Sequence, residues 1–346
     1  MKTGLRADEW RVQESTKLTT SCPPRDSTRK LARVLLTLVM KSKTQQLNSW
    51  KTILAFAIIY IVWGSTFLAI RIGVRELPPF FFAAMRFLMA GLSLYLWMIA
   101  KGERSPTGRQ WLSAVLLALL IFVVDYGLLF WAEQRVPSGV AAVMMATIPL
   151  FTAVAEIILL GTQKLTVRLA LALLIGLGGV AVLMLPSLSL GAPIDRTGAA
   201  ALIFAAIGWS VASSLTRKLP LPQSQAMNSG AQMLAGGLLL SLASAALGEF
   251  HRFHLSAVSL GAWLALLYLI VPGSIVAFTA YLWLLNRESP TKVGTYAYVN
   301  PVVAVLLGYF LGDEALGLRI ILGTLLVLVS VVVIATTRAK RAPATA

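Results

Sequence analysis

The chain of 346 residues has few charged residues and almost no cysteine, and each shortage excludes a class of protein. Asp, Glu, Lys and Arg make up only 13% of it, whereas 58% is hydrophobic. A soluble domain carries roughly 25% charged residues. The single Cys22 excludes a disulfide framework within one chain. This composition is typical of an integral membrane protein.

Signatures of nucleotide, metal and catalytic sites are also missing from the sequence. No Walker A loop is present, and the glycines at 176–179 lie inside an apolar stretch with no strand before them, so they indicate close helix packing. His251 and His254 have a spacing that suits a metal, but no further ligand stands near them. No nucleophile, base and orienting group occur together. The sequence therefore predicts no cofactor, no metal site and no enzyme activity.

A strong positive charge is the next notable feature. The formal net charge is +16, from 30 Lys and Arg against 14 Asp and Glu. In a soluble protein this balance would suggest nucleic acid as a partner. Here the basic residues lie at the ends of apolar stretches, where the cytoplasmic leaflet attracts them. We therefore expect a lipid bilayer and a small solute as partners, and no nucleic acid.

Long apolar stretches are what the chain has in abundance. About 20 apolar residues cross a bilayer core as one helix. The predicted spans are 52–72, 79–100, 112–133, 138–160, 168–186, 197–217, 227–247, 258–285, 292–311 and 317–337. Pro272 interrupts the eighth stretch, which we interpret as one kinked helix because two crossings would need more apolar length. The expected fold is an all-α integral membrane protein with ten transmembrane helices.

The basic residues set the orientation of these spans. With the N-terminus inside, fifteen basic residues fall in inner segments and six in outer segments. The inner ones are Lys41, Lys43, Lys51, Lys101, Arg104, Arg109, Lys164, Arg168, Arg217, Lys218, Arg287, Lys292, Arg338, Lys340 and Arg341. The outer ones are Arg71, Arg75, Arg135, Arg196, Arg252 and Arg319. Both termini are therefore predicted to be cytoplasmic.

The last five stretches repeat the pattern of the first five. Trp63 in the first stretch matches Trp209 in the sixth, at an offset of 146 residues. Because five is odd, the second half begins on the opposite side of the membrane, so the repeats are expected to be inverted, with a solute site near the midplane between them. The predicted domains are an N-terminal extension at 1–48, five-helix repeats at 49–190 and 191–338, and a cytoplasmic tail at 339–346.

The first 48 residues do not fit the repeat. They are polar and basic, and the apolar run at 31–40 is too short to cross a membrane. No small-residue cleavage site follows, so a signal peptide is not expected. We expect this extension to be disordered or not native, with the true start at Met40 or a nearby codon, because Lys41 and Lys43 make a cytoplasmic lead-in. An intact mass showing that the natural product begins at Met1 would contradict this.

Several motifs together resemble a known family. Trp63-Gly64-Ser65-Thr66-Phe67, Pro78-Pro79 followed by Met85-Arg86-Phe87-Leu88, and the segment 141–149 are similar to the EamA family of the drug/metabolite transporter superfamily. The resemblance covers residues 52 to about 338. It implies a ten-helix carrier of the bacterial inner membrane, many of whose relatives export amino acids and related metabolites. In the second repeat, Ala231 and Gln232 stand where the first has Arg86 and Phe87, so Arg86 has no symmetric twin.

Ionisable residues inside the spans are candidates for the mechanism, because each costs at least ~2.5–3.5 kcal/mol at mid-helix. Arg86 and Asp125 both lie roughly 10–12 Å below the outer surface. They are expected either to serve transport, with Arg86 meeting a carboxylate or phosphate and Asp125 taking a proton, or to form a structural ion pair. Glu156 is expected either to snorkel to the inner interface or to admit a cytoplasmic proton. Glu133 is expected to be an outer-loop charge.

Aromatic and polar residues near the midplane form a second group of candidates. With Arg86, the predicted substrate-binding residues are Trp63, Ser65, Thr66, Tyr126, Trp209, Tyr296 and Asn300. Pro149, Pro272 and Pro301 are expected to break their helices, and the carbonyl groups freed at Pro149 and Pro301 are expected to accept a substrate ammonium. The alternative is that the aromatic residues belong to interfacial belts.

These observations predict a secondary transporter that exports a small metabolite, such as an amino acid or a related compound, by alternating access. Energy would come from the solute gradient or from protons. The protein is expected to act as a monomer or a homodimer. The alternatives are a membrane-embedded enzyme, a lipid- or drug-handling protein without metabolite export, and a receptor or assembly scaffold.

Overall fold

Helices form all of the regular structure in the described part of the chain. The computed structural model describes residues 25–161, 165–184, 195–216, 218–285 and 296–338, together with residues 287 and 293. No strand occurs within these ranges. The helices of the first half are α1 (Arg25–Val74), α2 (Pro79–Ala100), α3 (Gly108–Ala118), η1 (Leu119–Gly127), α4 (Leu128–Glu133), α5 (Ser138–Met145), α6 (Ile148–Ala155), η2 (Glu156–Leu160) and α7 (Val167–Met184).

The second half continues in the same way. Its helices are α8 (Arg196–Leu215), α9 (Gln225–Ala246), η4 (Glu249–Arg252), η5 (Leu255–Ala257), α10 (Leu260–Tyr268), η6 (Leu269–Val276), α11 (Ala277–Leu285), α13 (Tyr296–Leu311) and α14 (Leu318–Arg338). Cys22 and the predicted tail at 339–346 lie outside the described residues.

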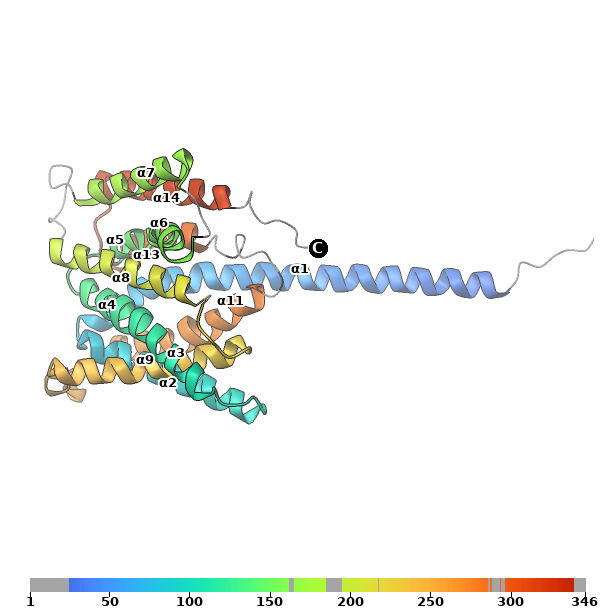
Figure 1. The fold of residues 1–346 in the computed structure, drawn as a ribbon, viewed down its shortest axis with the longest axis horizontal. Coiled ribbons are helices and arrows are strands. Elements are labelled where there is room, and N and C mark those ends of the chain that lie inside the picture. Colours follow the sequence, from blue (N-terminus) through green and yellow to red (C-terminus); the bar gives the residue numbers. More distant parts are fainter. Residues whose placement is uncertain are drawn as a thin grey trace, which may run out of the picture. The chain divides into compact units, whose positions relative to one another are not determined.

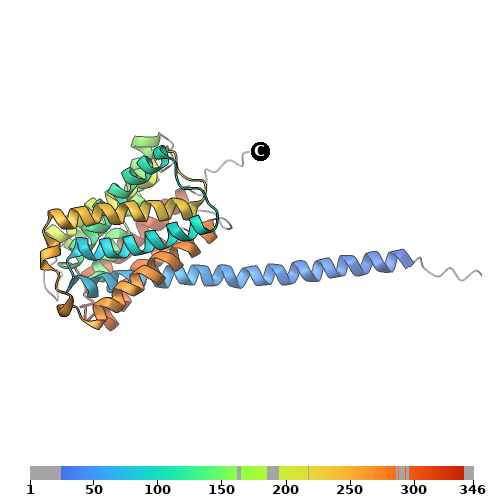
Figure 2. The ribbon, with the colours of Figure 1, turned by 90° about the horizontal axis from the view of Figure 1, so that it is seen from below.

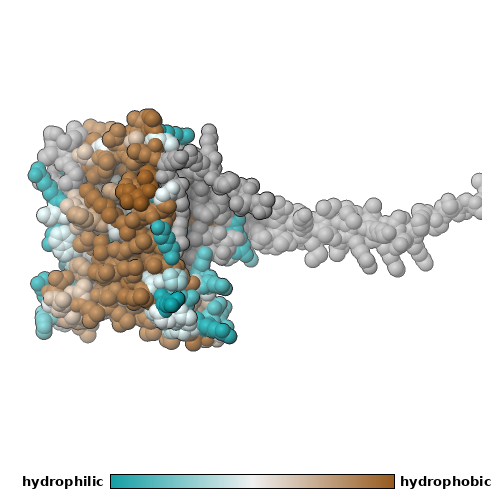
Figure 3. Space-filling view, viewed as in Figure 1, coloured by the Kyte–Doolittle hydropathy of each residue, from teal (hydrophilic) through white to brown (hydrophobic). Residues whose placement is uncertain are grey.

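Many of these helices are long and apolar enough to cross a membrane. Among the described residues, seven segments qualify, namely Trp50–Val74, Pro79–Ala100, Gly108–Glu133, Ser138–Leu160, Arg196–Leu215, Gln225–Ala246 and Leu260–Tyr281. Three further apolar helices are shorter, at Val167–Leu183, Val299–Leu311 and Leu318–Ile334. Figure 3 shows a broad hydrophobic band on one face of the bundle, with hydrophilic residues at both of its edges. This pattern fits a helix bundle embedded in lipid.

α1 begins much earlier than the span that the sequence predicts. The helix starts at Arg25, so residues 25–48, for which no regular structure was expected, are helical. The segment from Arg25 to Trp63 contains neither proline nor glycine, so nothing in it ends a helix. The first 24 residues lie outside the described part of the chain.

Three of the membrane helices contain π-helical turns. These are η1 in the helix from 108 to 133, η2 at the end of the helix from 138 to 160, and η6 in the helix from 260 to 285. Pro272 lies inside η6, and this helix continues on both sides of it, as expected for one kinked span. A wider turn frees backbone groups from the regular α-helical ladder, and such turns are frequent at functional sites.

The other two prolines behave differently from each other. The helix from 138 to 160 is interrupted between α5 and α6, and Pro149 is the second residue of α6, where its missing N–H has no cost. Pro301 lies inside α13, which is helical on both sides of it. The break that the sequence predicts at Pro301 therefore does not interrupt the helix.

Equivalent helices of the two halves pack against each other in antiparallel pairs. α2 lies beside α9, and α7 lies beside α14 (Figures 1 and 2). In the first pair, a Cβ atom on Gly91 would lie 2.4 Å from the backbone nitrogen of Leu234, and one on Gly237 would lie 2.6 Å from that of Leu88. Residue numbers therefore rise along α2 as they fall along α9. The missing side chains let the two backbones touch.

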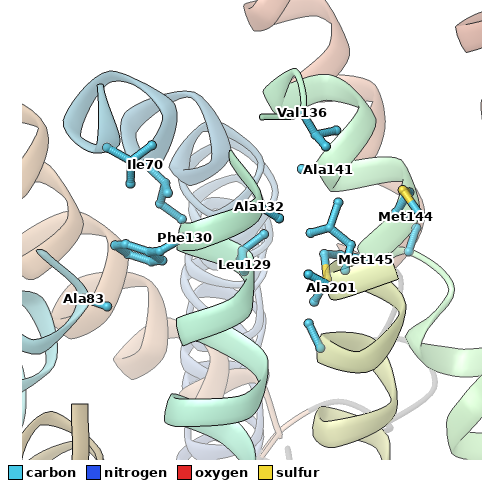
Figure 4. Packing of buried hydrophobic residues seen from close by; sticks show 14 of the residues in the cluster. Ile70, Ala83, Leu129, Phe130, Ala132, Val136, Ala141, Met144, Met145 and Ala201 are labelled. Carbon is cyan, nitrogen blue, oxygen red and sulfur yellow. The ribbon is translucent and has the colours of Figure 1, made fainter. Parts of the chain in front are cut away.

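One end of the bundle has a tightly packed apolar core. Figure 4 shows Ile70, Phe130, Val136 and Met145 among the buried side chains contributed there by α1, α4, the turn after α4, and α5. Ile70 is 1% exposed, and Phe130 and Val136 are fully buried. Inside a bilayer these side chains stabilise the bundle through close van der Waals packing rather than through removal from water.

Carboxylates join the two halves at this same end. Glu76 accepts hydrogen bonds from the backbone N–H (2.6 Å) and hydroxyl (2.8 Å) of Ser259, just before α10. Glu249 accepts two in the first turn of α2, from the N–H groups of Phe81 (2.8 Å) and Phe80 (3.5 Å). Glu314 accepts three at the start of α5, from Ser138 N–H and hydroxyl (both 2.7 Å) and from the next N–H (3.0 Å). Each bond satisfies donors that a helix start leaves unpaired.

We call this end the cap face; it consists of the loops 75–78, 134–137, 247–259 and 312–317. Every carboxylate cap on it crosses from one half of the chain to the other. Elsewhere in the described residues, Gln110 with Thr107, Ser224 with Met227 and Asp195 with Gly198 form local caps, whereas Lys218 Nζ crosses between the halves to the carbonyl oxygen of Leu159 (2.6 Å). The halves are therefore held together by charged hydrogen bonds at the cap face.

The Glu76 cap predicts how stability responds to acid. The hydrogen bonds from the Ser259 backbone N–H and hydroxyl hold the pKa of Glu76 below its ordinary value of 4.5. The folded protein then binds fewer protons than the unfolded chain, so the contribution is complete above the ordinary pKa and is lost as the pH falls through the folded pKa. Glu76→Gln should lower Tm by about 1–2 °C at pH 7 and by less at acidic pH.

Thermal unfolding in detergent, followed by tryptophan fluorescence across the acidic range, measures this difference. The control is Glu103→Gln, because Glu103 is exposed and its carboxylate makes no hydrogen bond within the described residues. A Tm difference between the natural chain and Glu76→Gln that stays constant with pH would contradict the role of the charged cap.

Candidate functional site

A cavity of about 150 Å³ lies between the two halves of the bundle. The first half supplies α1, α2, η1, α4, α5 and α6 to its wall, and the second half supplies α8 and α13. The lining residues are Trp63, Thr66, Phe67, Ile70, Arg86, Asp125, Tyr126, Leu129, Ala142, Met145, Ala146, Ile148, Pro149, Trp209, Tyr296, Ala297, Asn300 and Pro301. The wall is therefore mostly apolar and aromatic, with a few polar groups that can orient a ligand.

Arg86 is the cation of the cavity. It is 3% exposed, and its Nε donates to the hydroxyl of Ser274 in η6 (3.0 Å). The guanidinium carbon lies 4.7 Å from the ring centre of Phe87 and 5.3 Å from that of Tyr126. Its Nη1 is buried and has no hydrogen-bond partner. Arg86 is thus held in place by Ser274 and the rings, while one arm of its fork stays free to bind an anion.

Asp125 is the acid of the cavity, and it does not pair with Arg86. It lies in the π-helical segment η1 and is 1% exposed. Its Oδ1 is buried without a hydrogen-bond partner, and no ion pair joins it to Arg86. The structural ion pair, one of the two expectations for these residues, is therefore not formed in this structure. A cation and an acid remain in one cavity, each with an unused polar atom.

Aromatic rings form the walls beside these charges. The indole N–H of Trp63 donates to the carbonyl oxygen of Gly273 in η6 (3.1 Å). Its ring centre lies 5.0 Å from that of Tyr296 and 5.2 Å from that of Tyr281. Trp209 meets Tyr126 edge-on across the cavity, with 6.1 Å between ring centres. Tyr126 and Trp209 thereby join the two halves across the cavity.

The remaining polar lining comes from α1 and α13. The hydroxyl of Thr66 donates to the carbonyl oxygen of Trp63 (2.6 Å). The Asn300 amide nitrogen donates to the carbonyl oxygens of Tyr296 (3.2 Å) and Tyr60 (3.3 Å) in the orientation that satisfies both groups.

Some of the predicted site residues lie elsewhere. Ser65 does not line this cavity; its hydroxyl donates to the carbonyl oxygen of Val62 (2.9 Å) and contacts the hydroxyl of Tyr268 (2.5 Å). Glu156 begins η2 and is 7% exposed, so it is buried inside the protein and does not line the cavity. Pro272 is also outside the lining, although the carbonyl of its neighbour Gly273 holds Trp63.

Sequence reasoning missed Ser274, which matters to the site, and the burial of Glu133, which lies outside the cavity lining. Ser274 orients Arg86 and donates its own hydrogen to the carbonyl of Leu269, five residues earlier (2.8 Å). The break at Pro272 was the available signal for a wide turn there. Glu133, expected to be a loop charge, is fully buried instead. That expectation was wrong because α4 continues to residue 133, and Arg71 of α1 donates a hydrogen bond to the main-chain oxygen of Glu133.

A helix bundle of membrane-spanning length, built from two like halves around a polar and aromatic cavity, is the architecture of a membrane carrier. The chain belongs to the EamA-like transporter family, whose model matches it twice, over residues 50–185 and again over 196–336. The two matches confirm the internal repeat that the sequence indicates.

Curated relatives carry transporter names. The chain is similar to the inner membrane transporter YedA of Escherichia coli (strain K12), with 41% identity over 75% of this chain and 82% of that protein. It is also similar to the transporter YoaV of Bacillus subtilis (strain 168), with 24% identity over 80% and 94% of the two chains. The WAT1-related chloroplastic protein At3g02690 of Arabidopsis thaliana is 29% identical over 79% and 66%. YedA and YoaV are named as transporters and not as enzymes.

Among solved structures, the fold has a clear counterpart. A chain titled "Crystal structure of protein" matches with a TM-score of 0.55 and 24% identity, over 84% of this chain and 99% of that one. At this identity the likeness supports the fold alone. The protein is therefore an all-helical membrane protein of a transporter family, which removes the membrane-embedded enzyme from the alternatives.

Proposed function

We propose that this protein is a secondary transporter that moves small zwitterionic metabolites, of the amino-acid class, out of the cytoplasm by alternating access. The observation that carries the proposal is the pair of unused charged atoms in one cavity, Arg86 Nη1 and Asp125 Oδ1. A carboxylate fits the free arm of the guanidinium, and an ammonium fits the acid. The aromatic wall suits an apolar side chain on such a solute.

The proposed topology has ten spans in two inverted five-helix repeats, with both termini in the cytoplasm of a bacterium. The antiparallel pairing of α2 with α9, and of α7 with α14, supports inversion, because equivalent helices of inverted repeats run in opposite directions. The excess of basic residues in the predicted inner loops supports the orientation. The inner membrane is the location named for YedA.

Alternating access requires that the cavity open to one side at a time. In this structure, the cap face is closed by the packed core around Ile70 and by the carboxylate caps between the halves. By the charge distribution, the cap face is the outer side. We propose that export proceeds when the halves rock apart at this face and release the solute outward.

Transport of the solute is proposed to be coupled to protons through Asp125. Asp125→Asn should reduce proton-driven flux at least about tenfold, the effect of ~1.4 kcal/mol, because the amide cannot take up or release a proton. The protein should still fold, since Asp125 makes no hydrogen bond in the described residues. The measurement is uptake of labelled amino acids, nucleosides and sugars into inverted vesicles, with and without a proton gradient.

The control for this experiment is Glu103→Gln, which removes an exposed carboxylate far along the chain from the cavity lining. Flux by Asp125→Asn that matches the natural protein at every pH would reject Asp125 as the coupling residue. Flux of nucleosides or sugars alone would reject the amino-acid class.

A further inference from the structure

Glu133 is a buried carboxylate that the site described above does not use. It is the last residue of α4 and is 0% exposed, and neither of its carboxylate oxygens has a hydrogen-bond partner within the described residues. An ionised carboxylate deprived of water and of donors is so costly that such a group takes up a proton instead. The neutral acid is therefore the form that this environment accepts.

The nearest cation is directed away from the carboxylate. The Nη1 of Arg71 donates to the main-chain carbonyl oxygen of Glu133, and its Nε is buried without a partner. No ion pair joins the two side chains. Arg71 therefore has an unpartnered donor, and the Glu133 carboxylate has two unpartnered acceptors.

Among the charges around Glu133, Glu314 favours the neutral form, whereas Arg71 and Arg86 favour the ionised form. Glu314 lies within electrostatic range, and its three hydrogen bonds at the start of α5 stabilise its negative charge. A second negative charge beside it is unfavourable. The titratable and charged groups around α4 are Arg71 on α1, Arg75 in the loop after it, Arg86 on α2, Asp125 and Tyr126 on η1, Arg196 on α8 and Glu314 in the loop before α14; α5 has none.

We propose that Glu133 is a proton-binding residue of the cap face, neutral while this face is closed and ionised and paired with Arg71 when it opens. Opening would admit water to Glu133 and separate it from Glu314, whose caps on α5 cross between the halves. The proton leaves from the carboxyl oxygen to water, and the carboxylate accepts the spare Arg71 donor. Closure reverses both steps, with the proton taken from the outer side.

In the transport cycle this would make Glu133 a second proton site, separate from Asp125. That link rests on the proposed function, but the protonation and the opening can be measured without any substrate. Buried carboxylates can titrate as high as about pH 8–9. If the closed state holds one more proton than the open state, the ratio of open to closed protein rises with pH. Above the pH at which Glu133 titrates, this rise is up to about tenfold per pH unit.

The first experiment reports opening through a thiol in the cavity. Ile70→Cys, in a Cys22→Ser background, places the reporter on the cavity wall near the cap face. Right-side-out membrane vesicles are treated with a membrane-impermeant maleimide from about pH 5 to about pH 9. Each labelling rate is divided by that of the unfolded protein at the same pH, which removes the titration of the thiol itself.

The expected result is a labelling rate that rises about tenfold or more with pH in the Glu133 background and stays low in Glu133→Gln. Glu103→Gln should follow the Glu133 background. Glu133→Asp, which keeps a titratable group, should retain the rise with a displaced midpoint. A rise in Glu133→Gln equal to that in the Glu133 background, or no rise in either, would overturn the proposal.

The second experiment detects the proton directly. At neutral pH, the infrared carbonyl stretch of protonated carboxylic acids should be weaker in Glu133→Gln than in the natural chain. The same loss should appear when Glu133→Gln is added to Asp125→Asn. Glu103→Gln should leave the intensity unchanged. Unchanged intensity in Glu133→Gln would show that Glu133 is ionised in the closed state, against the proposal. Absence of flux for every solute, with both results as expected, would reject the carrier and leave Glu133 as a proton-binding residue.

Discussion

Arg86→Gln is expected to reduce flux of an amino acid by about ten- to a hundredfold, because a hydrogen bond to a charged group contributes ~1.5–3 kcal/mol. The substitution removes the cation of the cavity lining, whose buried Nη1 has no hydrogen-bond partner. Flux of the corresponding amine, which lacks the carboxylate, should change little. The measurement is exchange in proteoliposomes, comparing an amino acid, its decarboxylated amine and its deaminated acid.

Two variants separate solute binding from structural support. Ser274→Ala removes the hydrogen bond to Arg86 Nε but leaves the cation, so flux should fall less than in Arg86→Gln. Arg109→Gln removes an exposed arginine near the start of α3 and serves as the matched control. If Arg86→Gln lowers flux of the amine as much as flux of the amino acid, Arg86 supports the fold and does not bind the carboxylate.

Gly91→Ala is expected to give the largest loss of stability of any small substitution in the bundle. A Cβ atom there would lie 2.4 Å from Leu234 N, 2.7 Å from Met233 C and 2.9 Å from Leu234 Cα. All three are backbone atoms, so α2 and α9 must separate to make room. Overpacking of this kind costs about 1–3 kcal/mol, or a fall in Tm of about 2–10 °C.

The matched control is Gly178→Ala in α7, where a Cβ atom would meet nothing within 4 Å. Alanine is the better helix former by about 0.5–1 kcal/mol, so this variant should be as stable as the natural chain or more so. Thermal unfolding of both variants in the same detergent makes the comparison. Equal Tm values for the two variants would show that the contact between α2 and α9 is not close-packed in solution.

Apolar length predicted the helices well because it is a local property. The prediction of 79–100 matches α2, and that of 138–160 matches the segment from α5 to η2. Local polar bonds caused the misses at helix starts. α3 begins at Gly108 rather than 112, since Thr107 and Gln110 form a capping box that lies outside the apolar run.

The cavity wall follows helical periodicity, and the outcome for Ser65 shows how that periodicity could have been used. Residues 63, 66, 67 and 70 of α1 line the cavity, at the spacing of one helix face, and residues 142, 145, 146 and 149 do the same. Ser65 is off this face, so the spacing alone excludes it. The unpaired state of Arg86 and Asp125 was not predictable, because pairing depends on rotamers and on Ser274, 188 residues further along the chain.

Glu133 shows the limit of sequence reading most clearly. It stands at the end of an apolar run, where a charged residue is normally solvated. Its burial depends on how α1 and the loop with Glu314 fold over it, and both lie far from it in sequence. Nothing in the local composition distinguishes Glu133 from Glu103, which is exposed.

The cap face also has a consequence for the order of synthesis. α2 and α5 belong to the first half, but their caps are Glu249 and Glu314. While the ribosome is still making the first half, the backbone N–H groups in the first turns of these two helices lack their carboxylate acceptors. They gain their partners only after the last helices have emerged. The first half therefore cannot reach its final structure on its own, and the second half completes it.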